Sequence, residues 1–151
     1  MVLYQLVRVN YLGSVWPLYA FLPGLGSGSH VVNVVSVAGV VAVGPYSASK
    51  HAQLGFSRST AVELAARGIS VHAVLPGFVE TPGFPQRHRF GALAYRLVAT
   101  PELVAERILD EVEHGRGEIY VPRWYRPAAW LQAVFPALVA RAQMSRRRSD
   151  P

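Results

Sequence analysis

Residues 31–50 read VVNVVSVAGVVAVGPYSASK, and this stretch decides the expected fold. Its first seven residues form a near-continuous β-branched run, which is typical of a strand buried on both faces of a parallel sheet. We expect a loop of small residues over 37–44 and a helix over 46–67. A second buried strand, ISVHAVL, is expected over 69–75 and is closed by Pro76-Gly77. Strand, helix and strand in this order indicate a parallel βαβ unit.

Further helices and one strand flank this unit. Residues 1–22 are apolar nearly all round, so we expect a helix that is buried on several sides. Thr100-Pro101-Glu102 supplies a cap, a first-position proline and an early carboxylate, which together predict a helix start. A third short strand is expected over 118–122 and a last apolar helix over 127–143, whereas 78–98 have no regular pattern. The alternation of strands and helices predicts a layered α/β fold with a parallel sheet.

Composition excludes several classes of function. The 151 residues amount to one domain or a piece of one, and 51% hydrophobic with 16% charged residues argue against disorder. The absence of cysteine excludes disulfides and thiolate metal sites, and the five histidines show no ligand spacing, so we expect no metal. Half of the net charge of +6 lies in residues 141–150. No aromatic residues interleave with the RRR run there, so nucleic acid is not an expected partner.

The apolar stretch 9–26 raises the possibility of a membrane span or a signal peptide. Two prolines and an asparagine interrupt it, so a buried helix and a cytoplasmic protein are expected instead. GLGSGS over 24–29 precedes a strand, whereas phosphate loops follow one and open a helix. We therefore interpret it as a flexible connector.

Tyr46 and Lys50 form the candidate chemical pair. They lie four residues apart on the expected helix, so they share one face a turn apart. A nearby ammonium favours the phenolate, and Ser36 at the end of the first strand could hold a carbonyl or alcohol beside it. Such a pair is suited to moving a proton on or off a C–O bond. Lys50 is the only lysine of the chain, which has 14 arginines. A site that needs a compact cation would keep lysine at this position even where the rest of the chain uses arginine.

Four motifs in the order of the chain resemble the classical short-chain dehydrogenase/reductase family. They are Val9-Asn10-Tyr11-Leu12-Gly13, Ser36-Val37-Ala38-Gly39, Tyr46-Ser47-Ala48-Ser49-Lys50 and Leu75-Pro76-Gly77-Phe78-Val79-Glu80-Thr81-Pro82. The resemblance implies a partial doubly wound, Rossmann-like parallel sheet of three strands with flanking helices. It assigns residues 1–123 to the C-terminal half of such a domain and leaves 124–151 as an apolar helix and basic tail.

The resemblance also implies a role for each site residue. Tyr46 is the general acid/base, and Lys50 lowers its pKa and holds the nicotinamide ribose. Ser36 positions the substrate oxygen, and Asn10 supports a water that relays protons to Lys50. On the residues alone, Asn10 could equally be an ordinary helix residue and Ser36 an ordinary strand end.

The cofactor implied by the resemblance is NAD or NADP. Tyr46 and Lys50 would contact it, and the turn Pro76-Gly77, with Val79 and Thr81, would face the nicotinamide carboxamide. Thr81 could otherwise be a turn residue or a helix cap. The choice between the two dinucleotides depends on the family's N-terminal cofactor half, which the chain lacks.

Two departures from the family pattern affect these expectations. Ser36 and Tyr46 are ten positions apart, a shorter stretch than the family usually shows, which leaves their separation in space open. The glycine-rich phosphate loop and its strands are missing, so we expect the first strand to present an open, apolar edge. Association into a homo-oligomer through the helices 1–22 and 46–67 would compensate.

We therefore expect an NAD(P)-dependent oxidoreductase acting on an alcohol, ketone or aldehyde. The aromatic residues Phe78, Phe84, Phe90 and Tyr95 favour a lipophilic small molecule. The alternative is a non-catalytic fragment that binds a partner or a membrane surface, with peripheral contact through the C-terminal helix and RRR. A hydrolase is excluded because no GxSxG elbow is present.

Overall fold

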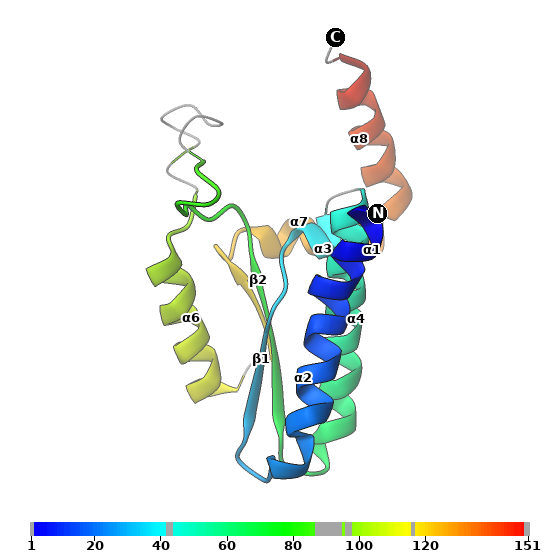
Figure 1. Ribbon diagram of the computed structural model, residues 1–151. Helices are drawn as coiled ribbons and strands as arrows, with labels where there is room; N and C mark the ends of the chain where they lie inside the picture. The colour runs from blue at the N-terminus through cyan, green and yellow to red at the C-terminus, as the bar shows by residue number, and fades with distance from the viewer. Residues whose placement is uncertain (1, 42–43, 87–94, 96–97, 116, 150–151) are drawn as a thin grey trace.

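Three parallel strands and the helices packed against them make up the computed structural model in Figure 1. The structure describes residues 2–41, 44–86, 95, 98–115 and 117–149, with the backbone alone described for 145–149. The strand order is β1 (His30–Val34), β2 (Ser70–Pro76) and β3 (Glu118–Val121). Both pairings are parallel. The predicted α/β class and three-stranded parallel sheet are thus confirmed.

β1 lies at one edge of the sheet. Its backbone bonding to β2 continues past the strand, since Val35 N donates to the Val74 carbonyl and Val37 N to the Pro76 carbonyl. The expectation that this strand is buried on both faces is wrong, because only Asn33 of β1 is buried and Val34 is 48% exposed. β2 is the central strand and is buried from its second residue onward. The open edge expected for the first strand is therefore what the described chain shows.

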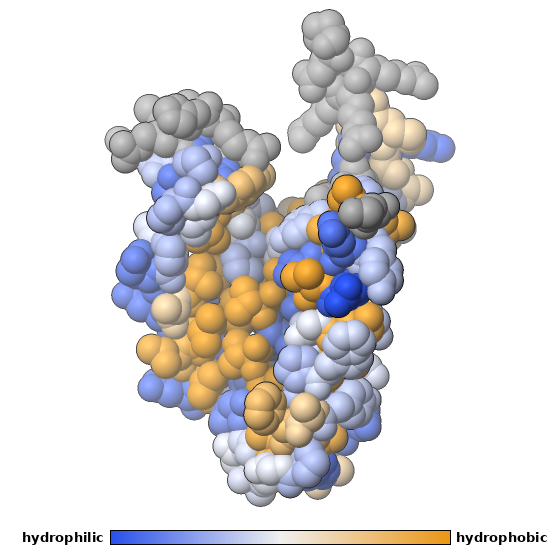
Figure 2. Space-filling model, viewed as in Figure 1, coloured by the Kyte–Doolittle hydropathy of each residue, from blue (hydrophilic) through white to orange (hydrophobic). Residues whose placement is uncertain are grey.

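The first helix combines three helical geometries. α1 (Val2–Leu6) passes into a π-helix, η1 (Val7–Leu12), then into α2 (Gly13–Phe21), and a 3₁₀ turn, η2 (Leu22–Gly24), ends it. The predicted helix is confirmed, and its predicted burial on several sides is wrong. Leu18 is its only buried residue, because one face of the helix packs on α4 (Pro45–Ala65) and on the start of β2. Figure 2 shows apolar residues on the surface between α6 (Pro101–His114) and α2.

The predicted loop over 37–44 is wrong in its described first part, where α3 (Ala38–Val41) forms one helical turn. This turn packs directly on α4 (Pro45–Ala65). A Cβ on Gly39 would lie 2.9 Å from the Lys50 carbonyl oxygen, so only glycine permits the approach. His51 Nδ1 lies 2.7 Å from the Gly39 carbonyl and therefore carries the donated proton. These contacts fix the first part of α4 against α3, the turn that follows β1.

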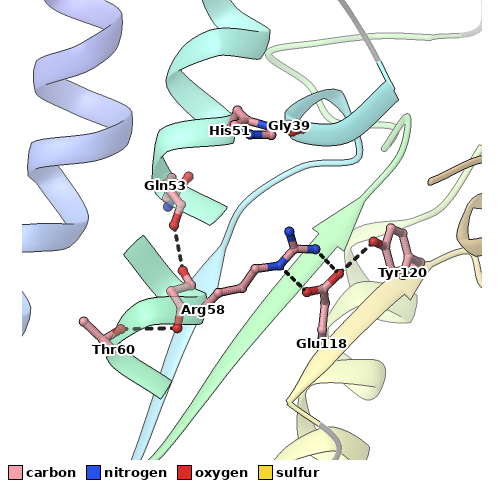
Figure 3. A network of polar contacts seen from close by, with 8 residues as sticks. Gly39, His51, Gln53, Arg58, Thr60, Glu118 and Tyr120 are labelled. Carbon is pink, nitrogen blue, oxygen red and sulfur yellow. Dashed lines mark hydrogen bonds and ion pairs between the residues drawn. The ribbon is translucent and has the colours of Figure 1, made fainter. Parts of the chain in front are cut away.

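Charged side chains attach α4 to the far strand of the sheet. Arg58 makes a bidentate pair with Glu118, with Nε 2.9 Å from Oε2 and Nη2 3.0 Å from Oε1 (Figure 3). The Tyr120 hydroxyl donates to the same carboxylate at 2.7 Å. Paired hydrogen bonds of a guanidinium and a carboxylate fix both groups in a plane. The helix that carries Tyr46 and Lys50 is thereby held across the sheet as well as against β1.

The C-terminal part of the chain begins with α6 (Pro101–His114). Leu103 N donates to Thr100 Oγ1 at 3.3 Å, so the predicted helix start is confirmed, and Gly115 ends the helix at φ 65°. The prediction of a single helix over 127–143 is wrong. The structure has α7 (Tyr125–Val134) and α8 (Pro136–Ser149), with Phe135 out of helical conformation between them. Pro136 disfavours the helical conformation of the residue before it.

Three hydrophobic clusters make up the described core. The largest lies between the sheet, α4 and α7, a second between α2, α4 and the start of β2, and a third under α6. α7 contributes Ala129 to the first cluster. The division of the chain at residue 123 stays a prediction. None of the helices in the described residues is both long and apolar enough to cross a membrane.

A buried polar group interrupts the third cluster. His72 of β2 and Glu111 of α6 are each 1% exposed, with His72 Nδ1 3.5 Å from Glu111 Oε1. His72 Nε2 lies 2.9 Å from His30 Nδ1. The imidazole thus contacts an exposed histidine of β1 on one side and faces the buried carboxyl group of Glu111 on the other, without a hydrogen bond to it. No metal-binding group of three or more His, Asp or Glu side chains occurs among the residues that the structure describes.

Candidate active site

A cavity of about 800 Å³ opens at the carboxyl ends of β1 and β2. In parallel sheets this end is where ligands bind. Seven of the eight predicted site residues line the cavity: Ser36, Tyr46, Lys50, Pro76, Gly77, Val79 and Thr81. The eighth, Asn10, lies in η1 (Val7–Leu12), which packs on α4, and is not among the lining residues. Residues far apart in the sequence are therefore brought to one cavity, although their chemical roles stay predictions.

Tyr46 and Lys50 lie on the same face of α4, as their spacing predicts. Lys50 Nζ is 6.0 Å from the centre of the Tyr46 ring. Tyr46 is 45% exposed, whereas Lys50 is 9% exposed. Burial lowers the pKa of Lys50 below its usual 10.5, because the charged form loses hydration. The phenol is accessible to a ligand while the ammonium beside it is largely enclosed.

Two oxygen atoms hold the Lys50 ammonium. Nζ donates to the Val34 carbonyl at 3.2 Å and to Gln53 Oε1 at 2.9 Å. Gln53 is 5% exposed and was missed by sequence reasoning. Its spacing of three residues from Lys50 places it on the same helix face, which is the signal that could have found it. An ammonium carries three donors, so one remains for a ligand.

Ser36 is fixed at the wall of the cavity where β1 ends. Its Oγ accepts from Ala38 N at 3.1 Å and makes a longer contact of 3.4 Å with the Pro76 carbonyl. The first of these contacts belongs to the turn that opens α3. Despite the short connection between them, Ser36 and Tyr46 line the same cavity.

Asn10 lies in the π-helix η1, a geometry often found at functional sites. Its Nδ2 donates to Ser49 Oγ at 2.9 Å, and Ser49 Oγ donates to the Tyr46 carbonyl at 2.7 Å. Its own carbonyl accepts from Ser14 Oγ at 3.3 Å. Asn10 is thus linked to the start of α4 through Ser49. The water-mediated link to Lys50 stays a prediction.

Tyr125 of α7 forms a wall of the cavity that sequence reasoning missed. Its ring packs on Gly77, where a Cβ would lie 2.6 Å from the ring Cζ, and stacks on Trp124 with centroids 3.7 Å apart. Burial raises the pKa of its hydroxyl. Phe78 and Phe84 also line the cavity, as their aromatic character led us to expect. Phe90 falls outside the described residues, and Tyr95 is absent from the lining.

Comparison with known proteins identifies the family. The family model described as short chain dehydrogenase matches residues 2–89. The chain belongs to the short-chain dehydrogenase family. The match covers more than half of the chain and includes the whole of the β1–α4–β2 unit.

Relatives extend this result. A predicted ketoacyl reductase of the monensin polyketide synthase from Streptomyces virginiae is 46% identical over 90 residues, which are 57% of this chain and 33% of that protein. The 17-beta-hydroxysteroid dehydrogenase 13 of Rattus norvegicus is 32% identical over 145 residues, or 89% of this chain and 46% of that protein. The chain therefore spans less than half the length of these relatives.

A solved structure agrees with the fold. A short chain dehydrogenase from Burkholderia cenocepacia J2315, in complex with NADP, is 28% identical with a TM-score of 0.72. The superposition covers 89% of this chain and 58% of that one. The three-stranded sheet and its helices are thus an arrangement that this family of dehydrogenases shares.

Proposed function

We propose that this chain carries the proton-transfer side of an NAD(P)-dependent oxidoreductase site that interconverts an alcohol and a ketone or aldehyde. One observation carries the proposal: Ser36, Tyr46 and Lys50 line a single cavity together with the turn at Pro76-Gly77. Family membership is the context that gives this constellation its chemical meaning. The isolated chain spans only part of its relatives, so its own activity is part of what is proposed.

Each side chain has a distinct task in this scheme. The Tyr46 hydroxyl gives its proton to a carbonyl oxygen in reduction and takes it back from the alcohol in oxidation. The Lys50 ammonium stabilises the phenolate that remains. Ser36 Oγ, at the wall of the same cavity, donates to the substrate oxygen and holds it beside Tyr46. The dinucleotide supplies or accepts the hydride.

The residues present fit the nicotinamide side of such a cofactor. Lys50 keeps one N–H donor beyond those given to Val34 and Gln53, and this donor suits a ribose hydroxyl. Val79 and Thr81 follow the Pro76-Gly77 turn along the same wall, where they would face the carboxamide. The NADP complex of the Burkholderia relative supports a nicotinamide cofactor for this chain as well.

The walls of the cavity favour a lipophilic substrate. Its aromatic lining comes from Phe78, Phe84 and Tyr125, and Val37 and Val41 add aliphatic surface. Apolar lining with a few placed polar groups is the usual character of a small-molecule site. The names of two relatives refer to a hydroxysteroid and to retinol.

Self-association of the chain is part of the proposal. The first helix exposes large apolar side chains, among them Val9, Trp16 and Phe21, each more than half exposed. Helices 1–22 and 46–67 lie side by side and offer a joint surface to a second copy (Figure 1). Light scattering of the purified chain at increasing concentration tests this, and a monomer at high concentration would contradict it.

Substitution of Tyr46 by phenylalanine tests the catalytic role. The chain is incubated with NADPH or NADH and a lipophilic ketone, and the loss of reduced-nicotinamide absorbance is followed. We expect Tyr46→Phe to abolish turnover while quenching of protein fluorescence by the dinucleotide stays unchanged. Tyr4→Phe, at an exposed tyrosine of α1, is the matched control and should behave as the parent.

Two results would overturn the proposal. Turnover by Tyr46→Phe equal to the parent would remove Tyr46 from the chemistry. Absence of turnover and of dinucleotide binding in the parent, together with co-sedimentation on anionic vesicles, would instead favour the non-catalytic surface-binding alternative.

A further inference from the structure

We propose that Gln53 is the positioning residue for Lys50: its carboxamide fixes the ammonium, favours its charged form and connects it to the first helix. The role of Lys50 in turnover rests on the proposed function, but the effect of Gln53 on Lys50 does not. Gln53 belongs to none of the motifs that carry the family resemblance. Its side chain nevertheless makes the shorter of the two hydrogen bonds to Lys50 Nζ, at 2.9 Å.

The orientation of the Gln53 carboxamide is determined by its neighbours. Its Nε2 lies 2.7 Å from Ser14 Oγ and 3.4 Å from the Val34 carbonyl. The Ser14 hydroxyl donates to the Asn10 carbonyl at 3.3 Å, so it accepts from Gln53. The Val34 carbonyl can only accept. Both contacts therefore require the amide nitrogen on that side, which leaves Oε1 facing Lys50.

A flipped carboxamide would bring two donors together. Its NH₂ group would then face the Lys50 ammonium, which has no acceptor, and its oxygen would face the Val34 carbonyl, which has no donor. Gln53 is 5% exposed, so water cannot readily compensate these losses. Gln53 thus presents its oxygen to Lys50 in one fixed orientation, beside the Val34 carbonyl that also accepts from Nζ.

The electrostatic setting makes this acceptor important. No carboxylate forms an ion pair with Lys50 among the residues that the structure describes; its acceptors there are the neutral oxygens of Val34 and Gln53. Desolvation lowers the Lys50 pKa, and hydrogen bonds to the charged form oppose that effect. Gln53 therefore helps to keep Lys50 charged beside the Tyr46 phenol.

One residue connects both members of the catalytic pair to the first helix. Asn10 reaches Tyr46 through Ser49, by the contacts described above, and reaches Lys50 through Ser14 and Gln53. These contacts bridge the π-helix and α4. The position of Lys50 thus depends on how the first helix packs against α4 as well as on α4 itself.

The single lysine of the chain allows a direct test. Lysine labelled with ¹³C at Cε gives one side-chain resonance by NMR, and its shift with pH reports the titration of Lys50. Gln53→Met removes the acceptor at similar volume, and Gln53→Glu keeps it and adds a negative charge. Gln5→Met, at an exposed glutamine of α1, is the matched control.

We expect the Lys50 pKa to fall in Gln53→Met, to rise in Gln53→Glu and to stay at the parent value in Gln5→Met. An unchanged Lys50 titration in folded Gln53→Met would overturn the proposal and leave Gln53 a packing residue. If Gln53→Met fails to fold by circular dichroism, Ser14→Ala removes the partner of the amide nitrogen. A fall of the Lys50 pKa in Ser14→Ala supports the proposal, and an unchanged value refutes it.

The Lys50 titration tests the role of Gln53, and the turnover assay tests the proposed function, so the two proposals can fail independently. The titration needs neither dinucleotide nor substrate, so it stands even if Tyr46→Phe remains active. Where the chain turns over, the pH profile of kcat should move in Gln53→Met in the same direction as the Lys50 pKa. A purely structural effect of the substitution would lower activity at every pH without moving the profile.

Discussion

The contact between Gly77 and Tyr125 predicts that Gly77→Ala is destabilising, because the added Cβ would overlap the Tyr125 ring. Replacing Tyr125 by alanine should remove this effect. Gly77 follows β2, and the Tyr125 ring lies directly on its Cα. A Cβ at this position would be 2.6 Å from Cζ and 2.7 Å from the hydroxyl oxygen of Tyr125, whereas ordinary contacts begin near 3.4 Å. The ring must therefore retreat by ~1 Å to make room, given those distances.

The expected cost follows from how the ring is held. Tyr125 stacks on Trp124 and packs on the main hydrophobic cluster, so a shift disturbs neighbours on both sides. Overpacking of this kind costs about 1–3 kcal/mol. Because the ring also lines the cavity, its displacement should weaken binding of dinucleotide or substrate as well.

Urea unfolding of a double-mutant cycle measures the effect. Gly77→Ala should lower the free energy of unfolding by about 1–3 kcal/mol in the parent and by about 0.5 kcal/mol or less in a Tyr125→Ala background. Gly55→Ala is the matched control: it lies in α4 with no atom near its added Cβ and should be neutral or stabilising. Equal costs of Gly77→Ala in both backgrounds would refute the steric explanation.

Three further predictions concern stability. His72→Leu leaves the buried Glu111 carboxyl facing an apolar side chain and should cost about 1–3 kcal/mol in urea unfolding, whereas adding Glu111→Met should recover most of the loss; a double variant as unstable as the single one would contradict this. Thr100→Ala removes the cap of α6 and should lower the free energy of unfolding by about 1 kcal/mol in the same assay. An unchanged free energy of unfolding would contradict a stabilising role of the cap. The Lys50 pKa is lower folded than unfolded, so the unfolded chain binds more protons between that pKa and 10.5. Stability should therefore rise with pH through this window, and Lys50→Met should lack the rise.

The sequence predicts the order of elements well because local patterns determine it. The β-branched runs at 31–37 and 69–75 and the cap at Thr100 act within a few residues. Burial is different, since it depends on what packs against a face. The first helix is apolar all round, yet it is mostly exposed because the described residues cover only one of its faces, with α4 and the start of β2. The break at Phe135 was locally readable from Pro136, and the prediction of one continuous helix overlooked it.

The residues of the candidate site divide in the same way, into those with a local sequence signal and those placed by packing. Tyr46 and Lys50 follow from their spacing on one helix and Ser36 from its position at the end of the first expected strand, whereas the resemblance to the family supplies the Pro76-Gly77 turn as a cofactor contact. Tyr125 has no local signal, because it is 48 positions from the glycine on which it packs. Gln53 could have been noted for its spacing, but its hydrogen bond to Ser14 depends on how two helices pack.

Under the proposed function, the short connection between Ser36 and Tyr46 bears on which substrates the site accepts. Its described part folds as α3 and packs on α4 through Gly39, so its conformation is fixed by the contact with that helix. To the cavity it contributes the small or aliphatic residues Val37, Ala38 and Val41, whereas the aromatic surface opposite comes from the segment after β2 and from α7. A helical turn packed closely on another helix has little freedom to adapt its shape to a ligand. Discrimination between substrates should therefore depend on Phe78, Phe84 and Tyr125 more than on the connection itself.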